Sequence, residues 1–150
     1  LCLLLGFMLG RKSKYEKRDY LKQFKIGKAT YSESLIYEAY GGLQNDGIML
    51  AVYYDVDAAK IIHQLDSWEK INDSPTISSI LKNVSSYFGL DFVIPEIASG
   101  NFFLYDNSQH KELRSEAEMN TLLLHSEDVN FSLVVWDDEK HTIYIVEYRI

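Results

Sequence analysis

Two runs rich in β-branched and aromatic residues close the chain, and this pair constrains the fold more than any other feature. Residues 131–136 (FSLVVW) and 142–148 (TIYIVEY) flank five polar residues, 137–141 (DDEKH). Runs of this composition favour β-strands, and a short polar connection joins them as an antiparallel hairpin. An isolated hairpin is marginally stable, so the rest of the chain is expected to add strands and a covering layer.

Further strand-like stretches precede the hairpin at residues 31–40, 48–55 and 101–106, and residues 92–94 are a shorter candidate. A helix over residues 32–40 is an alternative for the first stretch, because Leu35, Ile36 and Ala39 would also share one helical face. We favour a strand there. The turn-rich residues 41–47 then connect it to the next strand.

Helix signals are strongest around Ser74-Pro75, which suit the cap and the first turn of a helix. Apolar residues come next at helical spacing, and Gly89 stands where the helix would end: Ile77, Ile80, Leu81 and Val84. Asp57 is expected to cap a second helix that runs to about Ser67, and a third, short helix is expected over residues 112–124.

These elements predict an α+β fold. Its mainly antiparallel sheet has about five strands, with two to three helices packed on one face. We expect this domain to span residues 29–150.

Residues 1–10 are uncharged and apolar and end at Arg11-Lys12. As a helix they would rise about 15 Å, roughly half the hydrocarbon thickness of a bilayer. We interpret them as part of a transmembrane helix or signal anchor in a chain that lacks its upstream residues. A cleaved signal peptide and a core strand are the alternatives. Cys2 lies in this segment and is the one cysteine, so a disulfide within the chain and a thiolate zinc site are excluded.

Charge is divided along the chain. Residues 11–28 contain eight basic and two acidic residues, a net charge of +6; because the whole chain carries −7, residues 29–150 carry −13. We interpret residues 11–28 as a basic juxtamembrane stalk that favours anionic lipid. A domain at −13 repels a phosphate backbone, which argues against nucleic-acid binding.

The side of the membrane on which the domain lies has two interpretations. Basic residues directly after a span favour a domain in the cytoplasm. A lone N-terminal anchor usually exports the chain on its C-terminal side. We expect a single-pass protein of the cell membrane and favour an extracytoplasmic domain.

No pattern in the sequence predicts a metal, a cofactor or a catalytic set. The four histidines lack metal-ligand spacing, and Asp55 with Asp57 fits helix capping better than cation binding. Walker, dinucleotide and Gly-x-Ser-x-Gly motifs are absent from the sequence. The expectation is therefore a protein without a cofactor, and non-enzymatic. Alternation along the terminal hairpin places some aromatic residues, Trp136 among them, on the face away from the helices. They suit protein recognition there, or alternatively they simply cover a thin sheet.

The run from Tyr40 to Gly47 before a strand, a helix ending in Trp68 and the terminal pair of strands resemble a group of small proteins of low-GC Gram-positive bacteria. Members of this uncharacterised group look like single-span membrane-anchored domains whose equivalent loop is rich in glycine and aspartate. The resemblance covers roughly residues 30–150, although this chain lacks a histidine before Gly41. It implies the anchor and the architecture, and no activity.

The leading hypothesis is a membrane-anchored binding domain that engages a protein or peptide. Candidate binding residues come from the turn and the terminal hairpin: Gly41, Gly42, Asp46, Gly47 and Trp136. One alternative is an immunity or inhibitor protein whose acidic surface neutralises a basic toxin. Another is a small cell-envelope hydrolase that uses a pair of carboxylates, or His63 with an acid.

Overall fold

The computed structural model describes residues 20–41, 46–71, 74–88, 94–125 and 129–149. Within these ranges the chain forms four α-helices, one 3₁₀ helix (η1) and seven strands. In chain order they are α1 (Tyr20–Gln23), β1 (Glu33–Gly41), β2 (Asp46–Tyr54), η1 (Ala58–Lys60), α2 (Ile62–Leu65), β3 (Glu69–Lys70), α3 (Pro75–Tyr87), β4 (Gly100–Asp106), β5 (Lys111–Leu113), α4 (Glu116–His125), β6 (Asn130–Asp137) and β7 (Thr142–Arg149).

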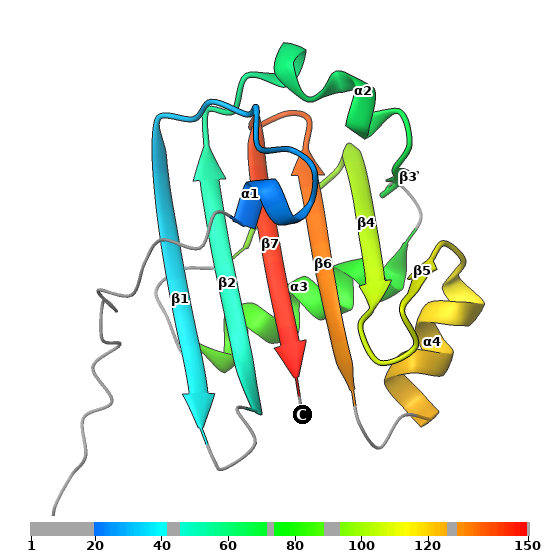
Figure 1. The fold of residues 1–150 in the computed structure, drawn as a ribbon. Coiled ribbons are helices and arrows are strands. Elements are labelled where there is room, and N and C mark those ends of the chain that lie inside the picture. Colours follow the sequence, from blue (N-terminus) through cyan, green and yellow to red (C-terminus); the bar gives the residue numbers. More distant parts are fainter. Residues whose placement is uncertain (1–19, 42–45, 72–73, 89–93, 126–128, 150) are drawn as a thin grey trace, which may run out of the picture.

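The strands form one sheet in the order β1-β2-β7-β6-β4-β3, and β5 also pairs with β4 (Figure 1). All of these pairings are antiparallel. The α+β class and the antiparallel sheet are thus confirmed. The sheet has seven strands where about five were expected, because β3 and β5, of two and three residues, are too short to leave a pattern in the sequence.

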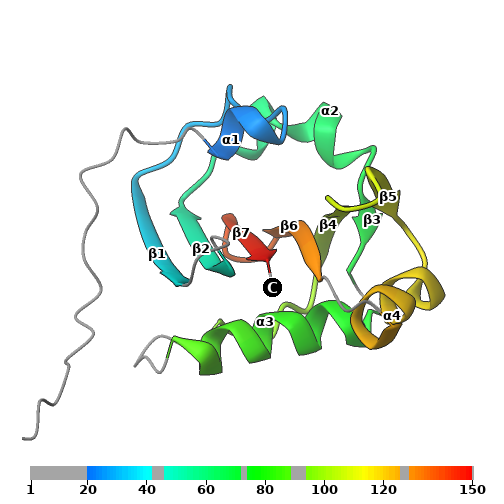
Figure 2. The ribbon, with the colours of Figure 1, turned by 60° about the horizontal axis from the view of Figure 1, so that its bottom comes forward.

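Helices cover both faces of the sheet (Figure 2). The first face carries α3 and α4, and the second face carries α1, η1 and α2. The expectation that helices pack on one face was wrong. Burial is continuous along the central strands, from Ile48 to Tyr53 and from Phe131 to Asp137. Strands that are apolar at both parities need cover on both sides.

The helix expected after Ser74 is confirmed as α3, which packs on the first face. Ser74 caps it by accepting a hydrogen bond of 3.2 Å from the backbone N–H of Ile77, and Pro75 occupies the first turn. Its apolar stripe is buried as the spacing predicts. The Glu116 carboxylate on α4 accepts hydrogen bonds from Ser74 Oγ and, at 2.5 Å, from Thr76 Oγ1. This contact fixes the start of α4 against the start of α3.

The second face is covered by two separate stretches of chain. Asp57 caps as expected, accepting a hydrogen bond of 3.1 Å from Ala59 N, but one 3₁₀ turn and one turn of α2 replace the expected longer helix. The other stretch contains α1 and lies within the segment interpreted as a stalk. Three apolar residues of this stretch, and Ala29 directly after it, are buried in the core of that face: Tyr20, Leu21 and Ile26.

Several expectations fall partly or wholly outside the described residues. These are the apolar segment 1–10, the first part of the stalk, Gly89 and two of the three residues of the strand candidate 92–94. Within the described ranges, no helix has both the length and the apolar character that crossing a membrane requires. The helix expected over residues 112–124 begins at Glu116, because residues 111–113 pair with β4 as β5.

Candidate binding surface

The glycine-rich turn joins β1 to β2 at one end of the sheet. Gly41 ends β1 opposite Asp46, which begins β2, whereas Gly42 lies outside the described residues. Gly47 faces Tyr40 across the ladder, and a Cβ atom on Gly47 would stand 2.3 Å from the carbonyl oxygen of Ala39. The packing of the hairpin backbone alone therefore requires a glycine at position 47.

Trp136 lies at the opposite end of the sheet. It pairs with Ile143, six residues along β7 from Arg149, the partner of Gly47. Six residues of a strand span about 20 Å, so Trp136 and the glycine turn do not form one site. Trp136 is also 1% exposed, in the core of the second face, where its Nε1 donates a 3.3 Å hydrogen bond to Asp138 Oδ1. The expectation of an exposed Trp136 was wrong, because a helical layer covers that face.

Two of the hairpin turns share one design, in which an aspartate precedes a histidine by four residues. Asp106 and Asp137 are buried, and each accepts hydrogen bonds of 2.9 to 3.1 Å from backbone N–H groups two and three residues later. His110 and His141 close these turns with φ of 53° and 50°. Left-handed backbone of this kind favours Gly, Asn, Asp and His. These aspartates and histidines therefore have structural roles.

The aspartate pair at the end of β2 is likewise engaged in local structure. Asp55 has φ of 51°, and its Oδ2 accepts a 2.5 Å hydrogen bond from Ser32 Oγ, whereas Asp57 caps η1. Over the residues that the structure places, no group of three or more His, Cys, Asp or Glu side chains is arranged to hold a metal ion.

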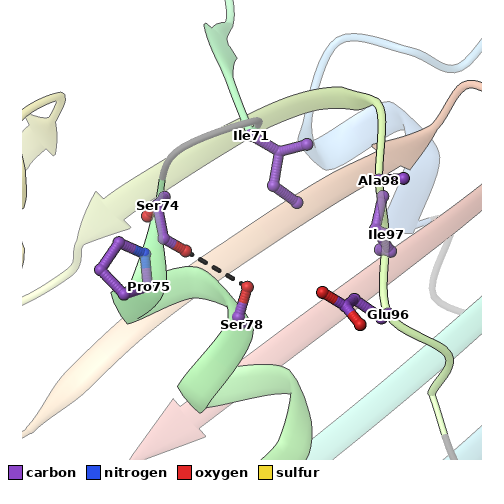
Figure 3. A pocket seen from close by; sticks show the side chains of 7 residues that line it. All are labelled: Ile71, Ser74, Pro75, Ser78, Glu96, Ile97 and Ala98. Carbon is purple, nitrogen blue, oxygen red and sulfur yellow. Dashed lines mark hydrogen bonds between the residues drawn. The ribbon is translucent and has the colours of Figure 1, made fainter.

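A surface hollow of about 490 Å³ lies between the start of α3 and residues 96–98, and Figure 3 shows the side chains that line it. Glu96 is the one acidic side chain among its lining residues. A second hollow, of about 270 Å³, includes Asp106 and Glu118. Asp106 holds its turn, and Glu118 contacts Lys111 at 2.5 Å, so both acids already have structural partners. This arrangement lends no support to a hydrolase that uses paired carboxylates.

The most distinctive surface is the outer edge of β1. In the described part of the chain β1 pairs with β2 alone, through nine consecutive residue pairs without a bulge. Figures 1 and 2 show no described element beyond it. The outward backbone N–H and C=O groups of such a strand can pair with another strand.

Exposed apolar side chains gather on β1 and just before it. Seven large apolar side chains are exposed in the described residues, and three of them lie within residues 31–40: Tyr31, Ile36 and Tyr40. Ile36 and Tyr40 lie on the second-face side of β1, with Glu38 between them, and they are 38% and 48% exposed. On the first-face side Leu35 and Tyr37 are half-buried against the core.

Acidic side chains accompany this edge. Glu38 accepts a 2.9 Å hydrogen bond from Tyr20 Oη, which ties α1 to β1. Burial and then this hydrogen bond raise the pKa of Tyr20 above its usual value. Burial raises the pKa of Tyr54 as well, and Tyr37 and Glu33 add smaller effects in the same direction. Both tyrosines stay neutral hydrogen-bonding groups at physiological pH.

The opposite edge of the sheet differs from β1. It consists of β3 and β5, which lie along β4 and have two and three residues. Each carries a lysine, Lys70 and Lys111. Shortness and lysine are two devices by which natural sheets discourage strand addition. The edge of β1 has neither device, since β1 has nine residues and residues 33–41 contain no lysine or proline.

Comparison with known proteins places the chain beside none of them: no protein-family model, no curated protein and no solved structure gives a significant match.

Proposed function

We propose that the chain is a membrane-tethered, non-enzymatic binding domain that engages a protein or peptide partner along β1. The observation that carries this proposal is the nine-residue edge of β1, unbulged and bordered by Tyr31, Ile36 and Tyr40. Strand addition to an exposed edge is a common mode of peptide recognition, in which backbone hydrogen bonds give affinity and flanking side chains give specificity.

The tether is supported by the sequence of residues 1–28, apolar and then basic. Tyr20 and Leu21 are buried on the second face, and Tyr20 bonds to Glu38 of β1. In this proposal the segment that leads from the membrane therefore joins the domain beside the binding edge. A partner at the same membrane would meet β1 at high effective concentration.

A photo-crosslinking experiment tests the binding surface. The photoreactive amino acid p-benzoylphenylalanine replaces either Tyr40 or Ile62 in the full chain, expressed in its source cells. These two side chains are 48% and 50% exposed, but Ile62 lies on α2, away from β1. We expect a protein adduct of defined mass from position 40 and not from position 62.

The same adduct should disappear when Ile36→Lys is added, since a lysine on an edge strand disfavours strand pairing. Circular dichroism and a thermal melt of each variant verify the fold. Adducts that are identical from both positions, or the absence of any adduct from position 40, would contradict the proposal.

A further inference from the structure

The geometry points to the chemistry of the partner, an inference that rests on this proposed function: an extended, mostly apolar segment with a basic side chain beside Glu38, added to β1 as a further strand. Three independent features carry this inference. They are the backbone geometry of the edge, the distribution of charge over β1 and β2, and the order of side chains along β1.

The backbone of β1 is ready to pair. Its register with β2 runs without interruption from Glu33 opposite Tyr54 to Gly41 opposite Asp46. Every second residue of an antiparallel strand turns its N–H and C=O away from the paired neighbour. A strand of nine residues thus offers four or five such residues to an added strand, whereas β3 and β5 are too short to offer more than one or two.

The strands β1 and β2 carry acidic side chains and no basic ones. The 31 residues from Ala29 to Ala59 contain no lysine or arginine, and they contain five acids: Glu33, Glu38, Asp46, Asp55 and Asp57. Glu33 and Glu38 are exposed on β1, and Asp46 and Asp55 stand at the two ends of β2. The nearest preceding bases, Lys22, Lys25 and Lys28, belong to α1 and the segment after it, which lies over the second face in Figure 1.

An edge of this charge attracts a basic strand and repels an acidic one. Opposite charges across neighbouring strands stabilise the pair, and like charges directly opposite destabilise it. Membranes and nucleic acids would not be attracted to this edge, since both present negative phosphates.

The side-chain order adds a pattern to the charge. On the second-face side, Glu38 stands between the exposed apolar side chains of Ile36 and Tyr40. An added strand in register would place a basic residue beside Glu38 and apolar residues two positions away on either side. On the first-face side it would place apolar residues beside Leu35 and Tyr37, which the core half covers. The expected ligand is therefore mostly apolar, with a basic residue at one parity.

Two synthetic peptides test this pattern. Both have nine residues and blocked ends. The basic probe carries lysine at its central and terminal positions and valine at the other positions, and the acidic probe has glutamate in place of each lysine. Isothermal titration of the full chain in detergent should give saturable binding of the basic probe at low salt, at least tenfold tighter than any binding of the acidic probe.

Hydrogen exchange measured by NMR identifies the contact. Binding of the basic probe should slow the exchange of every second backbone amide of β1 and leave the amides of β3 and β5 unchanged. This alternation is the signature of a backbone ladder, which a non-specific charge contact would not give.

Variants with reversed charge provide the matched comparison. Glu33→Lys/Glu38→Lys should weaken the basic probe about tenfold and strengthen the acidic one. The control variant, Asp66→Lys/Glu96→Lys, changes the net charge by the same amount at exposed positions away from β1. It should leave the affinities of both probes unchanged. Equal effects of the two double variants would overturn the inference, because net charge alone would then explain the binding.

Two further outcomes would also overturn it. If light scattering shows a dimer of the unliganded chain, with the amides of β1 already protected, then a second copy occupies the edge. If crosslinking from position 40 identifies a partner but neither probe binds, the proposed function stands and the basic strand is rejected. Failure of the crosslinking together with binding of the basic probe would instead support the edge chemistry and reject the cellular role.

Discussion

Tyr20 Oη donates a 2.9 Å hydrogen bond to Glu38 Oε1 and so joins α1 to the edge strand of the sheet. Tyr20 is 3% exposed. Its substitution by phenylalanine keeps the ring and removes the bond to a carboxylate. We expect Tyr20→Phe to lower the free energy of unfolding by about 1–2 kcal/mol in urea titrations. Tyr31→Phe is the control, since Tyr31 is exposed and packs edge-on against Tyr53 through its ring.

The raised pKa of Tyr20 should also make the domain less stable at alkaline pH. Burial and the Glu38 carboxylate hold the pKa of Tyr20 above its ordinary value, which is about 10 in an unfolded chain. The folded chain therefore keeps a proton that the unfolded chain loses above about pH 10, and stability falls as the pH rises past that value. Urea titrations between about pH 9 and 11 should show a shallower fall for Tyr20→Phe than for the unsubstituted chain.

The ionised Glu118 carboxylate should make the stability of the domain depend on pH in the acid range. Its carboxylate contacts Lys111 and accepts hydrogen bonds from the backbone N–H groups of Arg114 and Ser115, in that order of effect, which lowers its pKa to about 2. Because the folded pKa is depressed, this contribution is complete above the unfolded pKa near 4.5 and is lost as pH falls towards 2. An NMR titration of the Glu118 side-chain carboxyl measures the pKa directly. The free energy of unfolding of Glu118→Gln should vary less between about pH 5 and 2 than that of the unsubstituted chain.

Removal of the Asp137 carboxylate from the turn after β6 should destabilise the domain. Asp137 is 2% exposed and accepts two backbone hydrogen bonds. Asp137→Ala leaves those N–H groups unsatisfied and should cost about 1–3 kcal/mol in the free energy of unfolding. Asp137→Asn keeps an acceptor oxygen and should cost less. Glu139→Ala, at an exposed position of the same turn, should leave the thermal midpoint nearly unchanged.

The close approach of β4 to β6 leaves no room for a side chain at Gly100. A Cβ atom there would lie 1.8 Å from the carbonyl oxygen of Trp136, a backbone atom that cannot move aside alone. Gly100→Ala should destabilise the domain by about 3 kcal/mol or more. A Cβ atom on Gly27 would instead lie 2.6 Å from the γ-carbon of Lys22, a side-chain atom that can rotate away, so Gly27→Ala should cost less than Gly100→Ala. Similar thermal midpoints for the two variants would contradict the strand pairing around Gly100.

Local signals explain which parts of the fold the sequence could predict. The cap at Ser74, the proline after it and the helical spacing beyond them all lie within a dozen residues, and α3 forms where they indicate. The terminal hairpin was predicted for the same reason, since its two strands and its turn are contiguous. The start of α4 also has a local signal: Ser115 and Glu118 bond to each other's backbone N–H as a capping box.

Long-range packing explains the parts that were missed. The second helical layer is made of α1, η1 and α2, none longer than about one turn, and short segments leave no helical period to detect. Trp136 was expected on an open face because that layer was not foreseen. The signal that could have revealed it is the apolar character of residues 48–53 and 131–136 at both parities.

The candidate surface could be only half predicted. A connection was expected over residues 41–47, and its residues Gly41, Asp46 and Gly47 lie in the paired ends of β1 and β2; the border position of β1, by contrast, depends on strand order, which no local pattern encodes. Because β2 pairs with β7 on its other side, β1 lies at the border of the sheet.

The acids of β1 also determine which strands cannot join it. If two copies of this domain met edge to edge, both paired strands would carry Glu33 and Glu38, and like charges on neighbouring strands oppose pairing. A long open edge is ordinarily a hazard, because it offers a template for self-assembly into fibres. On β1 the charge that would attract a basic strand would also oppose pairing between identical molecules, so the same two carboxylates would favour one class of partner and disfavour self-assembly.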